Sequence, residues 1–179
     1  MGALQTLETK LDEVLGDKAP FKLPANARKT IVEYLPWINL VLGVLTLWTA
    51  WALWHWAHVA NSLIDYVNTL SKTYGGAQLS AHRLTAAIWL GIIVLVVEGL
   101  LFVAAFNGTK DRKKSGWDLL FYASLVNVVY GVVIAFSDYG GVGRLITTLI
   151  SSVIGLYFLF QIRSYYTGRQ SASQTTKSD

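Results

Sequence analysis

Residues 84–106 read LTAAIWLGIIVLVVEGLLFVAAF, an apolar run that only Glu98 interrupts. The run exceeds the ~20 helical residues that cross a hydrocarbon core of about 30 Å. Residues 36–56, 117–136 and 145–162 form three further runs of this kind. None of the four has the continuous polar face that a soluble helix needs. The sequence therefore predicts an all-α integral membrane protein, a bundle of four transmembrane helices.

The composition agrees with a lipid environment. Hydrophobic residues make up 53% of the 179 residues, and charged residues only 15%, against about 25% in typical soluble domains. The chain has no cysteine, which excludes disulfides, thiolate metal sites and thiol chemistry. The basic side chains lie mainly beside the apolar runs, where membrane orientation explains them better than nucleic-acid binding.

Lys and Arg side chains gather in alternate flanks of the four runs. All but three of the 15 precede the first run, join the second to the third or follow the fourth; the exceptions are Lys72, Arg83 and Arg144. Because basic flanks remain on the cytoplasmic side, this pattern predicts a multi-pass protein of the cell membrane with both termini in the cytoplasm. Trp37 and Trp117 are then expected at the inner membrane interface.

Three segments are expected outside the bilayer. Residues 1–35 place apolar side chains at helical spacing between positions 4 and 15, which predicts a short amphipathic helix, either a lead-in at the inner leaflet or a partner-binding helix. Residues 57–83 form an outer loop with structure of its own, in which the first transmembrane helix either continues until Gly75 or bends onto the membrane surface. Residues 163–179, rich in Ser, Thr and Gln, are expected to be a disordered cytoplasmic tail.

Glu98 is the most informative single residue, because an acid within a span is costly and usually faces the protein interior, a partner or water. Counting about 1.5 Å per residue along each helix predicts a shared polar layer. Its members are Thr46, Glu98, Asn127 and Ser152, with Tyr130 or Ser151 within reach. Two hypotheses follow: a proton or cation relay, or a protonated Glu98 that bonds to Asn127 and fixes the helix register.

His55 and His58 lie one helical turn apart, and His82 follows in the same outer loop. Their spacing matches no established zinc pattern, so we expect no metal site and no cofactor. The sequence also contains no nucleophile elbow, phosphate-binding loop, HExxH motif or dinucleotide fingerprint. We therefore expect the protein not to be an enzyme.

Three stretches carry a family resemblance: KKSGWDLLFY at 113–122, VYG at 129–131 and IGLYFLFQ at 154–161. In them the chain resembles a group of small four-span membrane proteins of candidate phyla radiation bacteria, some of which carry a chromate-transporter label. The glycine-proline signature of chromate transporters is absent here. The resemblance implies a bacterial cytoplasmic membrane and supplies no mechanism.

Two functions from different classes fit these observations. The first is a structural or accessory membrane protein whose partners are the lipid bilayer and either a second copy or another membrane protein, with no nucleic acid. The alternative is a small ion- or proton-coupled transporter or channel that uses Glu98. They differ in whether the carboxylate of Glu98 is needed.

Overall fold

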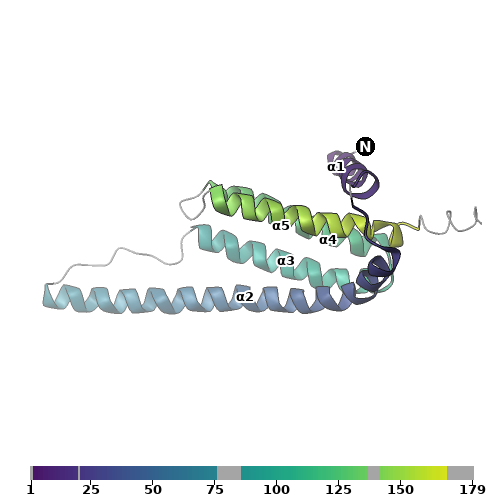
Figure 1. Cartoon of the computed structure of the whole chain (residues 1–179). Coiled ribbons are helices and arrows are strands. Elements are labelled where there is room, and N and C mark those ends of the chain that lie inside the picture. Colours follow the sequence, from purple (N-terminus) through teal and green to yellow (C-terminus); the bar gives the residue numbers. More distant parts are fainter. Residues whose placement is uncertain (1, 20, 76–85, 137–141, 169–179) are drawn as a thin grey trace, which may run out of the picture.

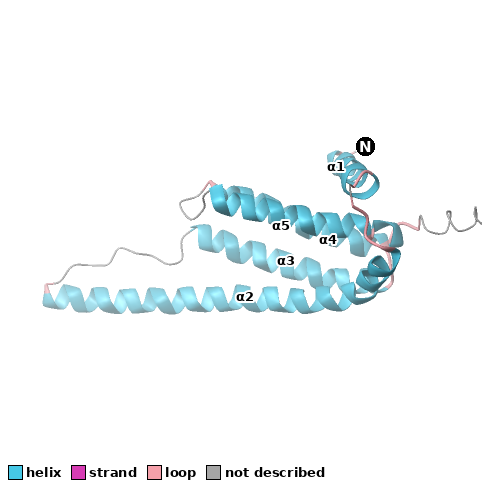
Figure 2. Ribbon diagram, in the orientation of Figure 1, coloured by secondary structure: helices cyan, strands magenta, loops and turns pink. Residues whose placement is uncertain are grey.

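The computed structural model of the chain describes residues 2–19, 21–75, 86–136 and 142–168 (Figure 1). Within these ranges the chain is helical and contains no strand (Figure 2). The elements in order are α1 (Ala3–Leu11), a π-helical segment (Asp12–Asp17), α2 (Ala25–Tyr74), α3 (Ala86–Lys110), α4 (Lys114–Ala135), α5 (Val142–Gln161) and a 3-10 turn (Arg163–Tyr165). Among the described residues, four helices, α2 to α5, are long and apolar enough to cross a membrane. The predicted all-α fold with four helices able to span a membrane is thereby confirmed.

The four long helices pack mainly in chain order. α2 lies along α3, α3 along α4, and α4 along α5, and these consecutive pairs carry the extensive contacts between described transmembrane helices. The arrangement differs from a bundle closed around one central core, because α2 contacts the rest of the array chiefly through α3. α2 begins, α3 turns into α4, and α5 ends at one end of the array, here named the α3–α4 end (Figure 1).

α2 is longer than the expected span 36–56 at both ends. It has 50 residues, begins after Pro24 and contains Pro36 in its interior. Its length of about 75 Å exceeds a hydrocarbon core of about 30 Å more than twofold, and it runs past the far ends of the other helices (Figure 1). It ends where Gly75 adopts a left-handed conformation with φ of 72° and donates its backbone N–H to the carbonyl of Ser71. The first helix therefore continues through residues 57–74 of the expected outer loop, and residues 76–83 of that loop lie outside the described residues.

Glycine pairs bring neighbouring helices close together. A Cβ atom on Gly43 of α2 would lie 3.0 Å from the carbonyl oxygen of Gly99 on α3. In the turn between α3 and α4, a Cβ atom on Gly116 would lie 2.3 Å from the backbone nitrogen of Thr109. Side chains at these positions would separate the helices, so the glycines set the spacing in the array.

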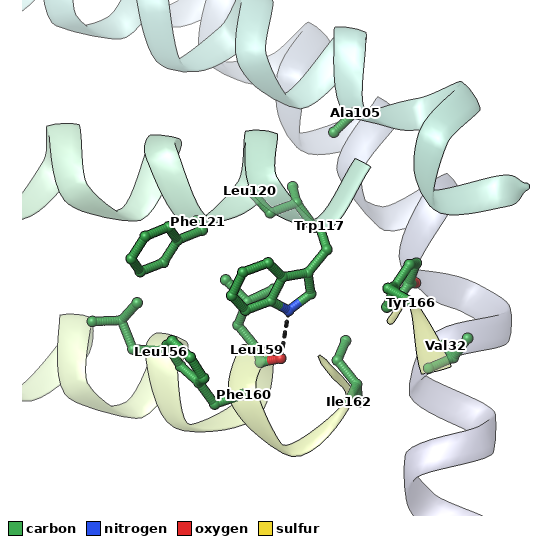
Figure 3. Close-up of a cluster of buried hydrophobic side chains, with 10 residues drawn as sticks. All are labelled: Val32, Ala105, Trp117, Leu120, Phe121, Leu156, Leu159, Phe160, Ile162 and Tyr166. Atoms are coloured by element: carbon green, nitrogen blue, oxygen red, sulfur yellow. Dashed lines mark hydrogen bonds between the residues drawn. The ribbon is translucent and has the colours of Figure 1, made fainter. Parts of the chain in front are cut away.

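The best-packed apolar cluster lies at the α3–α4 end (Figure 3). Trp117 and Phe121 of α4 stack with ring centroids 5.4 Å apart, and Phe160 of α5 meets both rings edge-on. The cluster comprises Val32, Ala105, Trp117, Leu120, Phe121, Leu156, Leu159, Phe160, Ile162 and Tyr166. Trp117 was expected at the membrane interface, where a tryptophan faces lipid, but it is fully buried in this cluster. Trp37, of which the same was expected, is 57% exposed.

The N-terminal segment is attached to the end of α5. Leu11 and Leu15 pack against the apolar cluster, and the side-chain amide of Gln161 donates a 3.0 Å hydrogen bond to the carbonyl of Leu15. The hydroxyl of Tyr157 donates a hydrogen bond to the carbonyl of Phe21. The amphipathic helix expected near the N-terminus is confirmed, and it is docked on the array.

Arg163, which follows α5, also holds the N-terminal segment in place. Its guanidinium forms ion pairs with Glu8 and Asp12, and only about 15% of each side chain is exposed. Residues 163–168, expected to be disordered, are therefore folded here, because the guanidinium links them to α1 and the π-helical segment. The remainder of the expected tail, residues 169–179, lies outside the described residues.

Candidate functional site

Glu98 lies in the middle of α3 and is only 7% exposed. The side chain of Asn127 on α4 is the polar neighbour of its carboxyl group. The carboxyl oxygen Oε1 is buried and has no hydrogen-bond partner among the described residues. An unpartnered buried oxygen costs about 1 to 3 kcal/mol. Glu98 thus lies beside a polar neighbour and keeps one free acceptor.

Glu98 faces a pocket of about 240 Å³ between α3, α4 and α5. We name it the Glu98 pocket; its lining residues are Glu98, Phe102, Ala123, Ser124, Asn127, Ser151, Ser152 and Gly155. Small side chains leave the space open, since a Cβ atom on Gly155 would meet no atom within 4 Å. Asn127, Ser151 and Gly155 are exposed, so the pocket opens on the surface of the array, with Glu98 buried at its base.

Ser152 supplies a second unsatisfied polar atom in this pocket. Its hydroxyl oxygen is buried and has no partner among the described residues. The hydroxyl of Ser124, by contrast, donates a 3.0 Å hydrogen bond to the carbonyl of Leu120 and is satisfied within α4. The Glu98 pocket therefore offers one carboxyl oxygen and one hydroxyl that a ligand could use.

The structure brings together four of the six residues named for the polar layer. Glu98, Asn127, Ser151 and Ser152 all line the pocket, whereas Thr46 and Tyr130 do not. Depth counting gives the height of a residue along its helix, but not the side of the helix on which it lies.

Thr46 and Tyr130 are kept apart from the pocket for different reasons. α2 packs on α3 through Gly43 and Gly99, and α4 and α5 form the remaining walls of the pocket, so Thr46 does not reach it. Tyr130 lies beside Gly91, where a Cβ atom would be 2.9 Å from the phenol oxygen. That glycine precedes Glu98 by about two turns of α3.

Sequence reasoning missed Ser124 and the two small residues that make room, Ala123 and Gly155. Ser124 precedes Asn127 by three residues and therefore lies one turn away on the same face of α4. That spacing could have identified it. Gly155 lies three residues after Ser152, on the same face of α5. A residue without a side chain one turn from a polar one is a weak sign of a pocket in a sequence.

The histidines have aromatic neighbours. His55 stacks on Trp51 with ring centroids 5.5 Å apart, and His58 stacks on Trp54 at 5.8 Å. His82 lies outside the described residues. Among the residues that the structure describes, no group of three or more His, Asp or Glu side chains is placed to hold a metal ion.

The Glu98 pocket has the chemistry of a proton or small-cation site. A carboxyl group can carry a proton or give its oxygens to a hard cation, and serine hydroxyls and an amide oxygen are further ligands of the same kind. No sulfur or imidazole group lines the pocket. No family model, curated protein or solved structure matches this chain.

Proposed function

We propose that this is a small non-enzymatic transporter or channel of a bacterial cell membrane that moves a proton or a small cation through the Glu98 pocket. One observation carries the proposal: the carboxyl oxygen Oε1 of Glu98 and the hydroxyl of Ser152 are buried, unpartnered and in the same pocket. If Glu98 only fixed the helix register, the protein would be more stable with a hydrogen bond to each of these two atoms, because unmade hydrogen bonds are costly in an apolar surrounding.

The orientation proposed with this function has both termini in the cytoplasm. The alternation of basic flanks supports it, and the α3–α4 end, which carries the N-terminal segment and the 3-10 turn, would then be the cytoplasmic end. Because the chain has no cysteine, single cysteines at Thr6 and Tyr74 give clean probes. In intact cells a membrane-impermeant maleimide should label only Tyr74→Cys; labelling of Thr6→Cys instead would reverse the orientation.

Ion flux in proteoliposomes tests the function. Wild-type protein should dissipate an imposed proton or monovalent-cation gradient, and Glu98→Gln should abolish the flux, because the amide can bond to Asn127 but cannot carry a proton or a charge. Glu33→Gln is the matched control, since Glu33 is exposed on α2 and does not line the pocket. Equal flux in wild type and Glu98→Gln, or no flux of any gradient in wild type, would reject the proposal.

A second candidate function, an accessory protein that assembles with a second copy, is favoured by the outer part of α2, residues 57–74. Val59, Leu63, Tyr66 and Leu70 recur at alternating spacings of four and three residues, and each is at least 40% exposed. This is the heptad pattern of a coiled coil, and the positions that flank the stripe at 60, 62, 67, 69 and 74 carry no charge. Copies in one membrane share an orientation, so a parallel pair would match each apolar side chain with its own counterpart.

Cysteine cross-linking in membranes tests this assembly. Leu63→Cys lies on the stripe and should form a disulfide between copies, whereas Asp65→Cys, two residues away and exposed, points to another side of the helix and should not. Equal cross-linking at both positions would reflect random collision. No cross-linking at Leu63→Cys would remove the second copy as the partner of α2.

A further inference from the structure

A second pocket, of about 160 Å³, lies at the α3–α4 end between the N-terminal segment and the end of α5. It is separate from the Glu98 pocket and shares no lining residue with it. We name it the basic end pocket; it is lined by Asp12, Gly16, Lys22, Arg28, Phe160, Gln161, Arg163, Ser164 and Thr167. Three of these side chains are cationic and one is anionic.

The cationic side chains of this pocket are incompletely satisfied. Arg163 uses its two terminal nitrogens for Asp12 and Glu8, but its Nε atom is buried and has no hydrogen-bond partner in the part of the chain that the structure describes. The same holds for the Nε atom of Arg28 within the described ranges. Among the described residues, neither Arg28 nor Lys22 forms an ion pair with a carboxylate. The pocket therefore combines unbalanced positive charge with two unused donors.

The walls of the pocket are fixed by contacts already described. The hydrogen bonds from Gln161 to Leu15 and from Tyr157 to Phe21 hold the N-terminal segment beside α5. The hydroxyl of Thr167, another lining residue, donates a 3.2 Å hydrogen bond to the carbonyl of Arg163 and so stays folded against the turn. A ligand would meet a preformed site, and less binding energy would be lost in ordering it.

The place of the pocket in the fold suggests its ligand. It lies where the apolar run of α5 ends, which in a bilayer would be the boundary between hydrocarbon and water, where phospholipid phosphates are concentrated. Guanidinium groups recognise phosphate oxygens through charge-assisted hydrogen bonds. We infer that the basic end pocket binds a phosphate group through Arg28, Arg163 and Lys22, either that of an anionic phospholipid headgroup or free inorganic phosphate.

Binding measurements on the full-length protein in detergent test this inference. Phosphatidylglycerol is titrated into the protein and followed by native mass spectrometry, and inorganic phosphate is titrated by calorimetry. Arg28→Gln should weaken binding about tenfold, as expected for the loss of one charge-assisted hydrogen bond. Lys29→Gln removes the same charge from the next residue, which is exposed and outside the pocket, and should bind as wild type does.

The two ligand sources give different results. Binding of phosphatidylglycerol that inorganic phosphate does not displace would identify the lipid headgroup, and saturable binding of inorganic phosphate with the same variant pattern would identify the free anion. Arg28→Lys keeps the charge and should restore part of the affinity, which separates binding from misfolding. The inference fails if neither probe binds saturably, or if Arg28→Gln and Lys29→Gln have equal effects.

Discussion

The indole nitrogen of Trp117 on α4 donates a 2.9 Å hydrogen bond to the carbonyl oxygen of Leu159 on α5 (Figure 3). Leu159 lies in the last turn of α5, where carbonyl groups have no partner within the helix. The same ring lies under the guanidinium of Arg163, 5.3 Å from its centre. One side chain thus joins α4, the end of α5 and the turn that holds the N-terminal segment.

Trp117→Phe keeps an aromatic ring but leaves the carbonyl of Leu159 buried without its donor. We expect a loss of about 1 to 3 kcal/mol in the free energy of unfolding. Denaturant unfolding in detergent micelles measures this loss. Trp48→Phe is the control, because Trp48 is 65% exposed and should change stability little; equal effects of the two variants would contradict the role given to Trp117.

Gly116→Ala should disrupt the turn between α3 and α4. The added Cβ atom would lie 2.3 Å from the backbone nitrogen of Thr109 and from the carbonyl carbon of Gly108, and backbone atoms cannot move aside cheaply. We expect a destabilisation of about 1 to 3 kcal/mol, seen as a lower midpoint of thermal unfolding. Gly143→Ala, where a Cβ atom meets nothing within 4 Å, should not lower the midpoint. A midpoint for Gly116→Ala at or above that of wild type would count against the close approach.

Arg163→Gln should release the N-terminal segment. The substitution removes the largely buried cation that Glu8 and Asp12 share and leaves Glu8 only the more distant Lys114, at 3.5 Å, and breaking a buried pair is unfavourable. We expect trypsin to cleave after Lys10 and Lys18 about tenfold faster, which corresponds to about 1.4 kcal/mol. Glu13→Gln, which loses only an exposed ion pair with Lys18, should be cleaved at the wild-type rate. Unchanged cleavage of Arg163→Gln would show that the apolar contacts hold the segment alone.

Tyr166→Phe should stabilise the protein slightly. The phenol oxygen of Tyr166 is buried and has no hydrogen-bond partner among the described residues, so removing it relieves a desolvation cost of about 1 kcal/mol. Burial raises the pKa of this phenol from 10.0 to about 12.

That pKa gives the pH dependence of the same variant. Because the folded-state pKa is raised, ionisation of Tyr166 leaves stability unchanged below pH 10.0 and lowers the stability of wild type as the pH rises through about 12, so the advantage of Tyr166→Phe should grow over that range. The tyrosinate absorbance of wild type minus Tyr166→Phe should therefore have a midpoint near 12. A midpoint near 10, or a less stable Tyr166→Phe, would contradict the buried, unpartnered hydroxyl.

The sequence predicted the features that a bilayer imposes on every chain that crosses it. Apolar runs long enough to span it became α2 to α5, and the helical spacing of Val59, Leu63 and Leu70 agreed with the extension of α2 to Gly75. Glu98, Asn127 and Ser152 were predicted to meet because a buried acid in lipid needs polar neighbours at its own depth.

The contacts that the sequence did not predict depend on how each helix is rotated about its axis. Gly43 and Gly99 determine which side of α2 meets α3, and no hydropathy pattern distinguishes that side in a helix that is apolar all round. Arg163 and Trp117 were interpreted only as a topology charge and an interfacial ring. Their contacts join residues more than 40 positions apart, which local spacing does not reveal.

The Glu98 pocket is proposed as the path of the ions, and Gly155→Leu tests this proposal most directly. Gly155 is an exposed lining residue of the pocket with open space around it, so a leucine side chain fits there without displacing a neighbour and narrows the mouth of the pocket. Gly143→Leu is the matched control on the same helix, also in open space and outside the pocket. In proteoliposomes we predict that Gly155→Leu loses the proton or cation flux of wild type while Gly143→Leu keeps it. Wild-type flux through Gly155→Leu would contradict the account.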